Sequence, residues 1–446
     1  MKQRQGRRDG KDSGRKDAGP ERLYKGAQAV TETYGKIEKY TEIAYYILLV
    51  WFLAYRTFFN TMFRKDFGIK RVEGAETAWL VLMAALILFK LLKLQYYSRA
   101  EIAVSCILIL LGILVRRTSD TYWILMFPLL TVGAKKVPFD RILKLFLITV
   151  GGMLAVTVAA ACAGLITNLV YLQPEADGSL RVRSAYGTTY PTTFSEFVFF
   201  LSCAWLYLRR KKLNLLDLIL CGAVGVFLKI KCDAKTDALC MLLLAAVTGW
   251  IMVRGKLPEK AREIFRRLSA VLIAAMPLMA GWIILAARYY NPDNPLLSRI
   301  NTILNTRLSL GKKGFRKYGL SLLGTTVKYK TTGGKLEEVK NYFNLDSSYL
   351  MILINFGILM FLVLLALFVW SSYRAREEQD VLLLLLLTVI AAESFMENRL
   401  IQAQYDIFLL IFFASLRRED GRSFCMLELP RSAAQERAEA EKGEGV

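Results

Sequence analysis

Long runs of apolar residues, separated by short charged stretches, make up most of the chain. A bilayer core about 30 Å thick needs roughly 20 apolar residues per spanning helix, and only helices or closed barrels satisfy the backbone there. The runs are too long for barrel strands, so they predict an all-α, polytopic integral membrane protein with about 12 transmembrane helices. The runs cover residues 41–59, 78–95, 101–115, 120–134 (short, and either spanning or re-entrant), 142–172, 192–208, 214–230, 238–253, 268–287, 348–372, 380–398 and 404–416.

The charged stretches divide the chain into five regions. Residues 1–40 form a basic tail that we expect to be mobile and cytoplasmic. About nine predicted transmembrane helices follow in 41–287, and about three more in 348–416. A large extracytoplasmic loop, 288–347, separates the two sets, and residues 417–446 form a charged cytoplasmic tail.

Composition and charge agree with this organisation. The chain has 446 residues, is 54% hydrophobic and carries a net charge of +22. The cations fall between the apolar runs and not along one amphipathic face, which argues against a nucleic-acid partner. Loops on the side of the two termini hold more Lys and Arg than the short loops opposite, so the positive-inside rule places both termini in the cytoplasm.

The sequence lacks the residues that several kinds of catalytic and metal site require. The chain has no histidine, which excludes an imidazole base or ligand. Its seven cysteines show no metal-ligand or disulfide spacing, so we expect no metal and no cofactor. There is no Asp-x-Asp motif, Walker loop or Gly-x-Gly-x-x-Gly, which disfavours metal-dependent nucleotide-sugar transferases and ATP-driven pumps.

The large loop is strongly basic, with eleven Lys and Arg residues. It either is simply a soluble loop or attracts anionic lipid head groups or a lipid diphosphate. Asp293 or Asn294 can cap a helix that has Pro295 at its first position. An apolar arc would let this amphipathic helix lie on the outer membrane surface. The arc comprises Leu296, Ile300, Ile303, Leu304 and Leu308.

Arg307 falls inside that apolar arc, where a guanidinium is costly unless it snorkels or meets an anion. Snorkelling at a helix end and a diphosphate clamp are the two interpretations, and bidentate geometry suits Arg for the second. The following basic-aromatic segment, which contains Tyr318, is typical of head-group depth. We include Tyr318 and the loop's Arg299 among the candidate substrate-binding residues.

Asp346 stands where the loop runs into the next predicted helix, followed by Tyr349. It either caps this helix or acts as a general base at the membrane surface, accepting a proton from a sugar hydroxyl. Tyr349 is a further candidate substrate-binding residue. Near the outer end of a later helix, Glu393 and Glu397 are four residues apart, and intramembrane acids are functional candidates, unless they only pair with a basic residue of another helix.

Two earlier outer segments combine charge, hydroxyl groups and aromatic rings. Arg183, Tyr190 and Thr192 lie beside Gly and Pro, a set that suits sugar rings and anionic oxygens or forms an ordinary turn. The segment from Lys229 to Asp237 contains Lys235 and Asp237, which either bind substrate or belong to internal ion pairs.

These residues resemble those of bacterial O-antigen and capsular polysaccharide polymerases, relatives of the O-antigen ligases. The likeness covers residues 181 to 357. It comprises Asn305-Thr-Arg307-Leu-Ser-Leu-Gly311 with Phe315, Tyr318-Gly319 and Gly324; Asp346-Ser-Ser-Tyr349-Leu with Asn355-Phe-Gly357; Arg183-Ser with Gly187-Thr-Thr-Tyr190-Pro191-Thr192; and Ala234-Lys235-Thr236-Asp237. Family members often carry His where this chain has Tyr190 or Asp346, so a histidine-base mechanism is impossible here.

The resemblance implies a GT-C-like transmembrane glycosyltransferase of the bacterial plasma membrane. Its substrate would be an oligosaccharide repeat unit on undecaprenyl diphosphate, polymerised at the outer face into O-antigen, capsular or exopolysaccharide. Asp346 is then the candidate base, and Arg307, Arg183 and Lys235 would meet the leaving diphosphate in place of a metal. A chain-length regulator is a possible partner.

Two alternatives remain open. A ligase-like transferase would use the same donor with a different acceptor, and would transfer a finished chain once. A lipid-linked oligosaccharide flippase would move its substrate intact, but we see no internal repeat of the kind typical of transporters.

Overall fold

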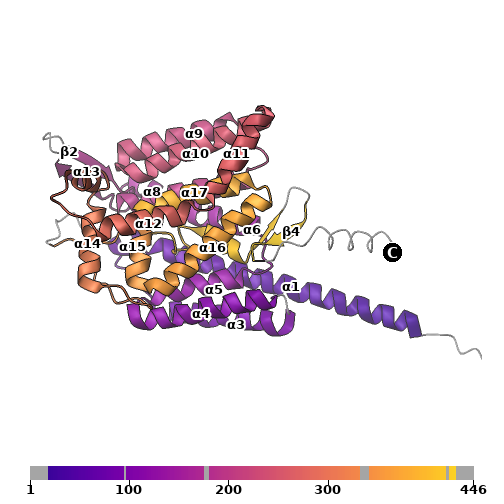
Figure 1. The fold of residues 1–446 in the computed structure, drawn as a ribbon. Coiled ribbons are helices and arrows are strands. Elements are labelled where there is room, and N and C mark those ends of the chain that lie inside the picture. The colour runs from indigo at the N-terminus through magenta and orange to yellow at the C-terminus, as the bar shows by residue number, and fades with distance from the viewer. Residues whose placement is uncertain (1–18, 95–96, 175–179, 332–340, 418–420, 428–446) are drawn as a thin grey trace, which may run out of the picture.

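The computed structural model describes residues 19–94, 97–174, 180–331, 341–417 and 421–427, and within these ranges it describes side chains from residue 35 onward except at 94, 173, 174, 180 and 181. The described chain is mostly helical (Figure 1). Its N-terminal half contains α1 (Gly19–Phe58), α2 (Phe63–Asp66), α3 (Ala75–Phe89), η1 (Lys90–Leu94), α4 (Arg99–Ser119), η2 (Tyr122–Leu125), α5 (Met126–Gly133), α6 (Phe139–Phe146), η3 (Leu147–Gly151), α7 (Gly152–Cys162), β1 (Val170–Pro174), β2 (Leu180–Ser184) and α8 (Pro191–Leu208).

The remaining elements carry the large loop and the C-terminal helices. They are α9 (Leu215–Phe227), η4 (Leu228–Cys232), α10 (Lys235–Val253), η5 (Arg254–Lys256), α11 (Glu259–Leu272), α12 (Ala275–Arg288), α13 (Pro295–Ile303), α14 (Arg307–Tyr318), α15 (Ser348–Met351), η6 (Ile352–Phe356), α16 (Gly357–Glu377), α17 (Val381–Met396), η7 (Ile407–Phe412), β3 (Ser415–Arg417) and β4 (Ser423–Cys425).

Five helices among the described residues are long and apolar enough to cross a membrane. A sixth candidate is the pair α11 and α12, which is bent by 46° at its break. This confirms the coarse prediction of a helical protein with several possible membrane spans. The five helices are Ala75–Lys93, Arg99–Ser119, Phe139–Cys162, Lys235–Lys256 and Ser348–Glu377.

Four details differ from the sequence-based expectation. The helix α1 begins at Gly19, so at least residues 19–40 are helical and not an irregular tail; residues 1–18 lie outside the described part. The run 142–172 stops being helical at Cys162. Its end forms β1, which pairs antiparallel with β2. The strands β3 and β4 form a second hairpin, so the fold is not purely α.

The run 404–416 is wrong as a helical span, because its only helix is the six-residue 3₁₀ segment η7. The chain nevertheless travels between the two ends of the bundle here, since Glu397 lies beside the large loop while β3 lies at the other end (Figure 1). Every residue from 403 to 414 is buried, and η7 packs against α5, α6 and α16. Non-helical backbone at such a depth is tolerated where protein shields it from lipid.

The outer loop does not form one continuous amphipathic helix. It folds as α13 and α14, which are separated because Asn305 and Thr306 adopt left-handed backbone conformations with φ of 47° and 65°. The predicted start of the first helix is confirmed: the Asn294 side chain accepts from the Leu296 and Leu297 amides at 3.0 and 3.1 Å, with Pro295 at the first position. Leu308 is buried inside the protein, so the predicted arc does not form a single surface stripe.

Two glycines fix the loop to the start of α16. Gly324 and Gly357 both have positive φ, at 82° and 88°. A side chain at Gly324 would collide with the backbone of Asn355 and Phe356, and one at Gly357 would collide with the backbone of residues 322 to 324. The loop is therefore held against the bundle by a contact that only glycine permits at both positions.

The elements are arranged so that the chain has two distinct ends. The start of α1 and the hairpin β3–β4 lie at one end, and α13, α14 and β2 lie at the opposite end (Figure 1). This arrangement places the large loop away from the beginning of α1, as the predicted topology requires.

Candidate functional site

A cavity of about 450 Å³ opens at the end of the bundle that carries the large loop. It brings together four segments that are far apart in the sequence: the β2–α8 connection, the start of α10, the α13–α14 junction, and residues 342–397. Its lining residues are Arg183, Tyr190, Thr192, Asp233, Ala234, Lys235, Thr236, Asn305, Thr306, Arg307, Leu310, Tyr342, Asp346 and Glu397.

Arg183 and Tyr190 form one wall of the cavity. The β1–β2 pairing places Arg183 opposite Tyr171. The Arg183 guanidinium donates to the Cys232 carbonyl and the Tyr190 hydroxyl, both at 3.3 Å, and lies 5.4 Å from the centre of the Tyr190 ring. The pair therefore presents a cation and an aromatic ring side by side, with Thr192 following at the start of α8.

Lys235 is the first residue of α10 and is exposed. It makes no ion pair within the described part of the chain. Just before it, Asp233 has a left-handed backbone (φ 45°) and its carboxylate accepts from Lys229 at 2.6 Å. Lys229 and Asp233 therefore form an internal ion pair, as one interpretation predicted, whereas the charge of Lys235 is available to a ligand in the cavity.

Arg307 begins α14 and is only 7% exposed. Its guanidinium donates to the Met396 carbonyl at 2.6 Å, to the Leu304 carbonyl at 3.2 Å and to the Glu397 carboxylate at 3.0 Å. The snorkelling interpretation is therefore wrong. Because a guanidinium has five N–H donors, two donors remain beyond these three contacts.

Asp346 does not cap the following helix. The residue at the cap position of α15 is Ser347, which makes no side-chain capping bond. The Asp346 carboxylate instead accepts from the Asn344 side-chain amide and lies half-buried at the cavity. Among the described residues it has no cationic partner.

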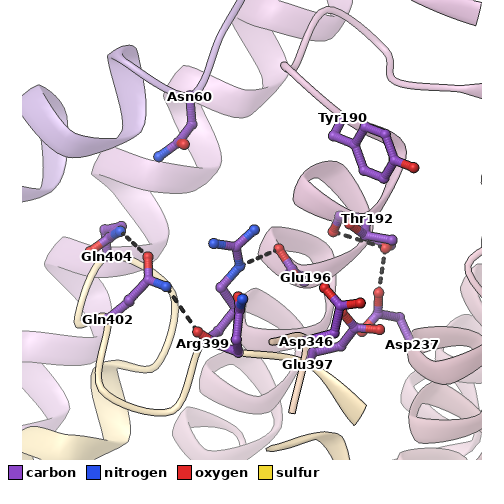
Figure 2. Close-up of polar contacts among 12 residues, drawn as sticks. Asn60, Tyr190, Thr192, Glu196, Asp237, Asp346, Glu397, Arg399, Gln402 and Gln404 are labelled. Atoms are coloured by element: carbon purple, nitrogen blue, oxygen red, sulfur yellow. Dashed lines mark hydrogen bonds and ion pairs between the residues drawn. The ribbon is translucent and has the colours of Figure 1, made fainter. Parts of the chain in front are cut away.

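The backbone around Asp346 is fixed to the segment that follows α17. The Asn398 side chain donates to the Leu345 carbonyl at 3.0 Å, and both the amide and the hydroxyl of Ser348 donate to the Glu397 carbonyl, at 3.0 and 2.6 Å. As a result, the carboxyl groups of Asp346, Glu397 and Asp237 lie close together below Tyr190 and Thr192 (Figure 2).

A second buried ion pair lies next to these three carboxyl groups. Arg399 donates through Nε to the Glu196 carboxylate at 2.7 Å, and Glu196 is 1% exposed (Figure 2). We did not single out Glu196 from the sequence. The signal was present, because an acid inside an apolar helix is a functional candidate.

Burial governs the charge of Glu397. Its pKa is raised above the ordinary value of 4.5, first by desolvation, against the opposing effect of Arg307, and the nearby Asp346 charge raises it further. Desolvation and the Asp346 charge also raise the pKa of the Tyr342 hydroxyl, which lines the same cavity. Within this group Asp346 is the carboxylate that faces the cavity without a neutralising arginine.

Five predicted residues lie away from the cavity wall. Asp237 is fully buried one residue behind Thr236 and accepts from Ser195, and Glu393 is fully buried in α17. The Tyr349 hydroxyl donates to the Ala391 carbonyl at 2.7 Å inside the core. Arg299 is exposed on α13, and the hydroxyl of Tyr318 contacts the backbone of Lys328. Burial in the core separates Asp237, Glu393 and Tyr349 from the cavity, whereas Arg299 and Tyr318 lie elsewhere on α13 and α14.

Three residues that line this cavity adopt left-handed backbone conformations. Asp233, Asn305 and Thr306 all line it and all have positive φ. A β-branched residue such as Thr306 is rarely found there, and such strain, worth about 1–3 kcal/mol per residue, is characteristic of functional sites.

The cavity combines the elements of a transfer reaction. Arg183, Lys235 and the free donors of Arg307 can bind anionic oxygens, Tyr190 can stack on a ring, and Asp346 can accept a proton. No protein-family model, curated protein or solved structure matches the chain. The residues of the cavity are therefore the basis for proposing a function.

Proposed function

We propose that the protein is a membrane glycosyltransferase that polymerises undecaprenyl-diphosphate-linked oligosaccharide repeat units at the outer face of the bacterial plasma membrane. The observation that carries this proposal is the convergence of Arg183, Lys235, Arg307 and the unpaired Asp346 carboxylate on one cavity. Glycosyl transfer from a lipid diphosphate needs both a cation set and a base, at a membrane surface.

In the proposed reaction a sugar hydroxyl of the acceptor attacks the anomeric carbon of the donor. The Asp346 carboxylate takes the hydroxyl proton as the new carbon–oxygen bond forms. The bond from the anomeric carbon to the diphosphate oxygen breaks, and its electron pair leaves with the lipid diphosphate. Arg183 and Lys235, with the remaining donors of Arg307, stabilise the negative charge that develops there.

The ion pair between Arg307 and Glu397 gives the two residues different parts in this scheme. Glu397 neutralises much of the Arg307 charge and fixes the guanidinium at the cavity wall. Arg183 and Lys235, which make no ion pair among the described residues, supply most of the net positive charge. We therefore assign two roles to Arg307. Its ion pair with Glu397 positions the guanidinium, and its remaining donors bind the diphosphate.

The test uses the full-length protein in phospholipid nanodiscs with synthetic undecaprenyl-diphosphate-linked repeat units. Polymer of increasing length is the expected product. Transfer of one finished chain to a different acceptor would indicate a ligase-like reaction, and movement of intact substrate across a vesicle membrane without cleavage would indicate a flippase. Either result would contradict polymerisation.

The Asp346→Asn variant tests the catalytic assignment. Without a carboxylate to accept the proton, we expect turnover to fall at least about a hundredfold, in line with the usual contribution of general base catalysis. Thermal unfolding should stay near that of the wild type, because Asp346 caps no helix. Polymerisation at a near-normal rate by the variant would remove Asp346 from the mechanism.

A further inference from the structure

A second cavity, of about 390 Å³, lies on the other side of α14 from the first. Cations and hydroxyl groups dominate its walls, and it contains no carboxylate. Its lining residues are Tyr290, Pro292, Ser309, Lys312, Lys313, Arg316 and Lys317. We call this cavity the basic groove.

The four cations of the basic groove occupy one face of α14. With Ser309 they follow the helical spacing i, i+3, i+4, i+7 and i+8, so their side chains project in the same direction. Lys312 is held in place, because its Nζ donates to the Tyr290 carbonyl at 2.5 Å. Lys313, Arg316 and Lys317 are exposed, and none of the four makes an ion pair within the described ranges.

The four cations of the basic groove repel one another. Lys312 with Arg316, and Lys313 with Lys317, are like charges four residues apart, each pair costing about 0.2–0.5 kcal/mol. The helix dipole favours Arg316 and Lys317 in the last turn but not the two lysines before them. No acid lines the groove to offset this repulsion, which favours the binding of an anionic ligand there.

The opposite face of α14 holds the groove rigidly beside the first cavity. Gly311 packs so closely against Ala287 and Leu350 that an added Cβ would lie 2.8 Å from each side chain, and one at Gly314 would lie 3.0 Å from Ile354. Arg307, at the start of the same helix, lines the first cavity. The two cavities are therefore lined by different residues of the same helix.

An apolar stripe on α12 leads to the basic groove. Leu278, Trp282, Leu285 and Tyr289 are spaced four, three and four residues apart and are all exposed, so they lie along one side of the helix. The next residue, Tyr290, is part of the groove wall. Since α12 belongs to a candidate membrane span, a hydrocarbon chain can lie along this stripe with its charged head in the groove.

We propose that the basic groove binds the diphosphate of a second lipid-linked saccharide, the acceptor of the transfer reaction. This inference rests on the proposed function, in which donor and acceptor both carry a lipid diphosphate. The acceptor keeps its diphosphate, so its site needs cations and a path for the lipid but no base. The groove offers these features, and it shares α14 with the first cavity.

Binding stoichiometry tests the site separately from catalysis. Undecaprenyl diphosphate is added to the protein in phosphatidylcholine nanodiscs and counted by native mass spectrometry. We expect two bound molecules for the wild type and one for K313Q/R316Q/K317Q, which keeps the structural Lys312. The matched control K256Q/K260Q/R262Q removes three exposed cations near the opposite end of α10 and should still bind two.

Competition identifies the chemistry that the groove recognises. Inorganic diphosphate should displace the second molecule only at much higher concentration, because it lacks the lipid chain, and phosphatidylglycerol should not displace it at equal concentration. Equal displacement by phosphatidylglycerol would overturn the proposal in favour of a general anionic-lipid surface. Two bound molecules in the triple variant would overturn it as well.

Kinetics completes the test. The triple variant should raise the KM for lipid-linked units about tenfold, equivalent to about 1.4 kcal/mol, with little change in kcat at saturation. If the wild type binds two molecules and the variant one, but neither makes polymer, the proposed function fails while the second site stands. If polymer forms with an unchanged KM in the variant, the acceptor site is elsewhere.

Discussion

The sequence predicted which residues line the first cavity better than it predicted their contacts. The sequence identified Arg183, Lys235, Arg307 and Asp346, and the structure brings all four to one cavity. It could not reveal that Arg307 pairs with Glu397, since they are 90 residues apart in the chain. The sequence also could not reveal that Tyr349 is buried in the core, and we therefore expected it among the binding residues.

The Arg307–Glu397 pair should be a large contributor to the stability of the site. Removing one partner of a buried pair leaves an uncompensated charge and costs about 3–5 kcal/mol, so Arg307→Ala should lower the free energy of unfolding by that order. The double variant Arg307→Ala/Glu397→Gln should recover part of the loss. Unfolding in detergent micelles measures both. An equal loss in the double variant would show that the charge pairing is not the cause.

The raised pKa of Glu397 predicts a pH dependence of stability. The folded protein keeps this proton to a higher pH than the unfolded chain, whose carboxyl titrates near 4.5. The folded state therefore binds more protons above that pH, and stability falls as the pH rises through the folded pKa. Glu397→Gln should flatten this slope. Glu263→Gln, on α11, is the control for the loss of one carboxyl group, and an equal change of slope in both variants would contradict the assignment to Glu397.

At the scale of elements, apolar periodicity located most helices but not where they break. The run 268–287 is divided between α11 and α12, and the outer-loop helix is interrupted at Asn305 and Thr306. Such breaks depend on tertiary contacts that override local preference. The strand β1 was hidden because its first residues, beginning at Val170, belong to a long, mostly apolar run.

Gly357 offers a direct test of how the loop is attached to α16. Gly357→Ala would place a Cβ against the backbone of Gly324 at a φ of 88°, so we expect a loss of at least about 2 kcal/mol of stability. Gly222→Ala on α9 is the matched control. Nothing lies within 4 Å of its Cβ position, and Ala should stabilise that helix slightly. Comparable stability of the Gly357→Ala variant and the wild type would contradict the close contact.

For the whole molecule, the sequence predicted a helical membrane protein with its large loop and its termini at opposite ends. Several candidate spans agree with a helical membrane protein, and the start of α1 and the β3–β4 hairpin lie at the end opposite α13 and α14 (Figure 1). The cytoplasmic placement of both termini remains a prediction. The count of about twelve spanning helices remains a prediction, because several apolar runs fold as short or broken helices. Hydropathy measures composition along the chain, and it does not distinguish a lipid-facing helix from an irregular segment buried by its neighbours.

The proposal requires α14 to face the outside of the cell. Lys317→Cys should react with a membrane-impermeant maleimide in intact cells, because Lys317 is exposed on α14. Lys260→Cys, exposed on α11, should react only after the membrane is opened. The parent protein measures background labelling of the native cysteines. Labelling of Lys260→Cys but not Lys317→Cys in intact cells would place the cavity in the wrong compartment.

The buried stretch between Glu397 and Ser415 also bears on how the protein folds. Apart from the short 3₁₀ helix η7, this stretch has no helix to satisfy its backbone, so it is unfavourable in contact with lipid and must be packed between the other helices. Its first residues, Glu397 and Arg399, hold Arg307 and Glu196 in place. The packing of this segment and the assembly of the cavity wall are therefore coupled.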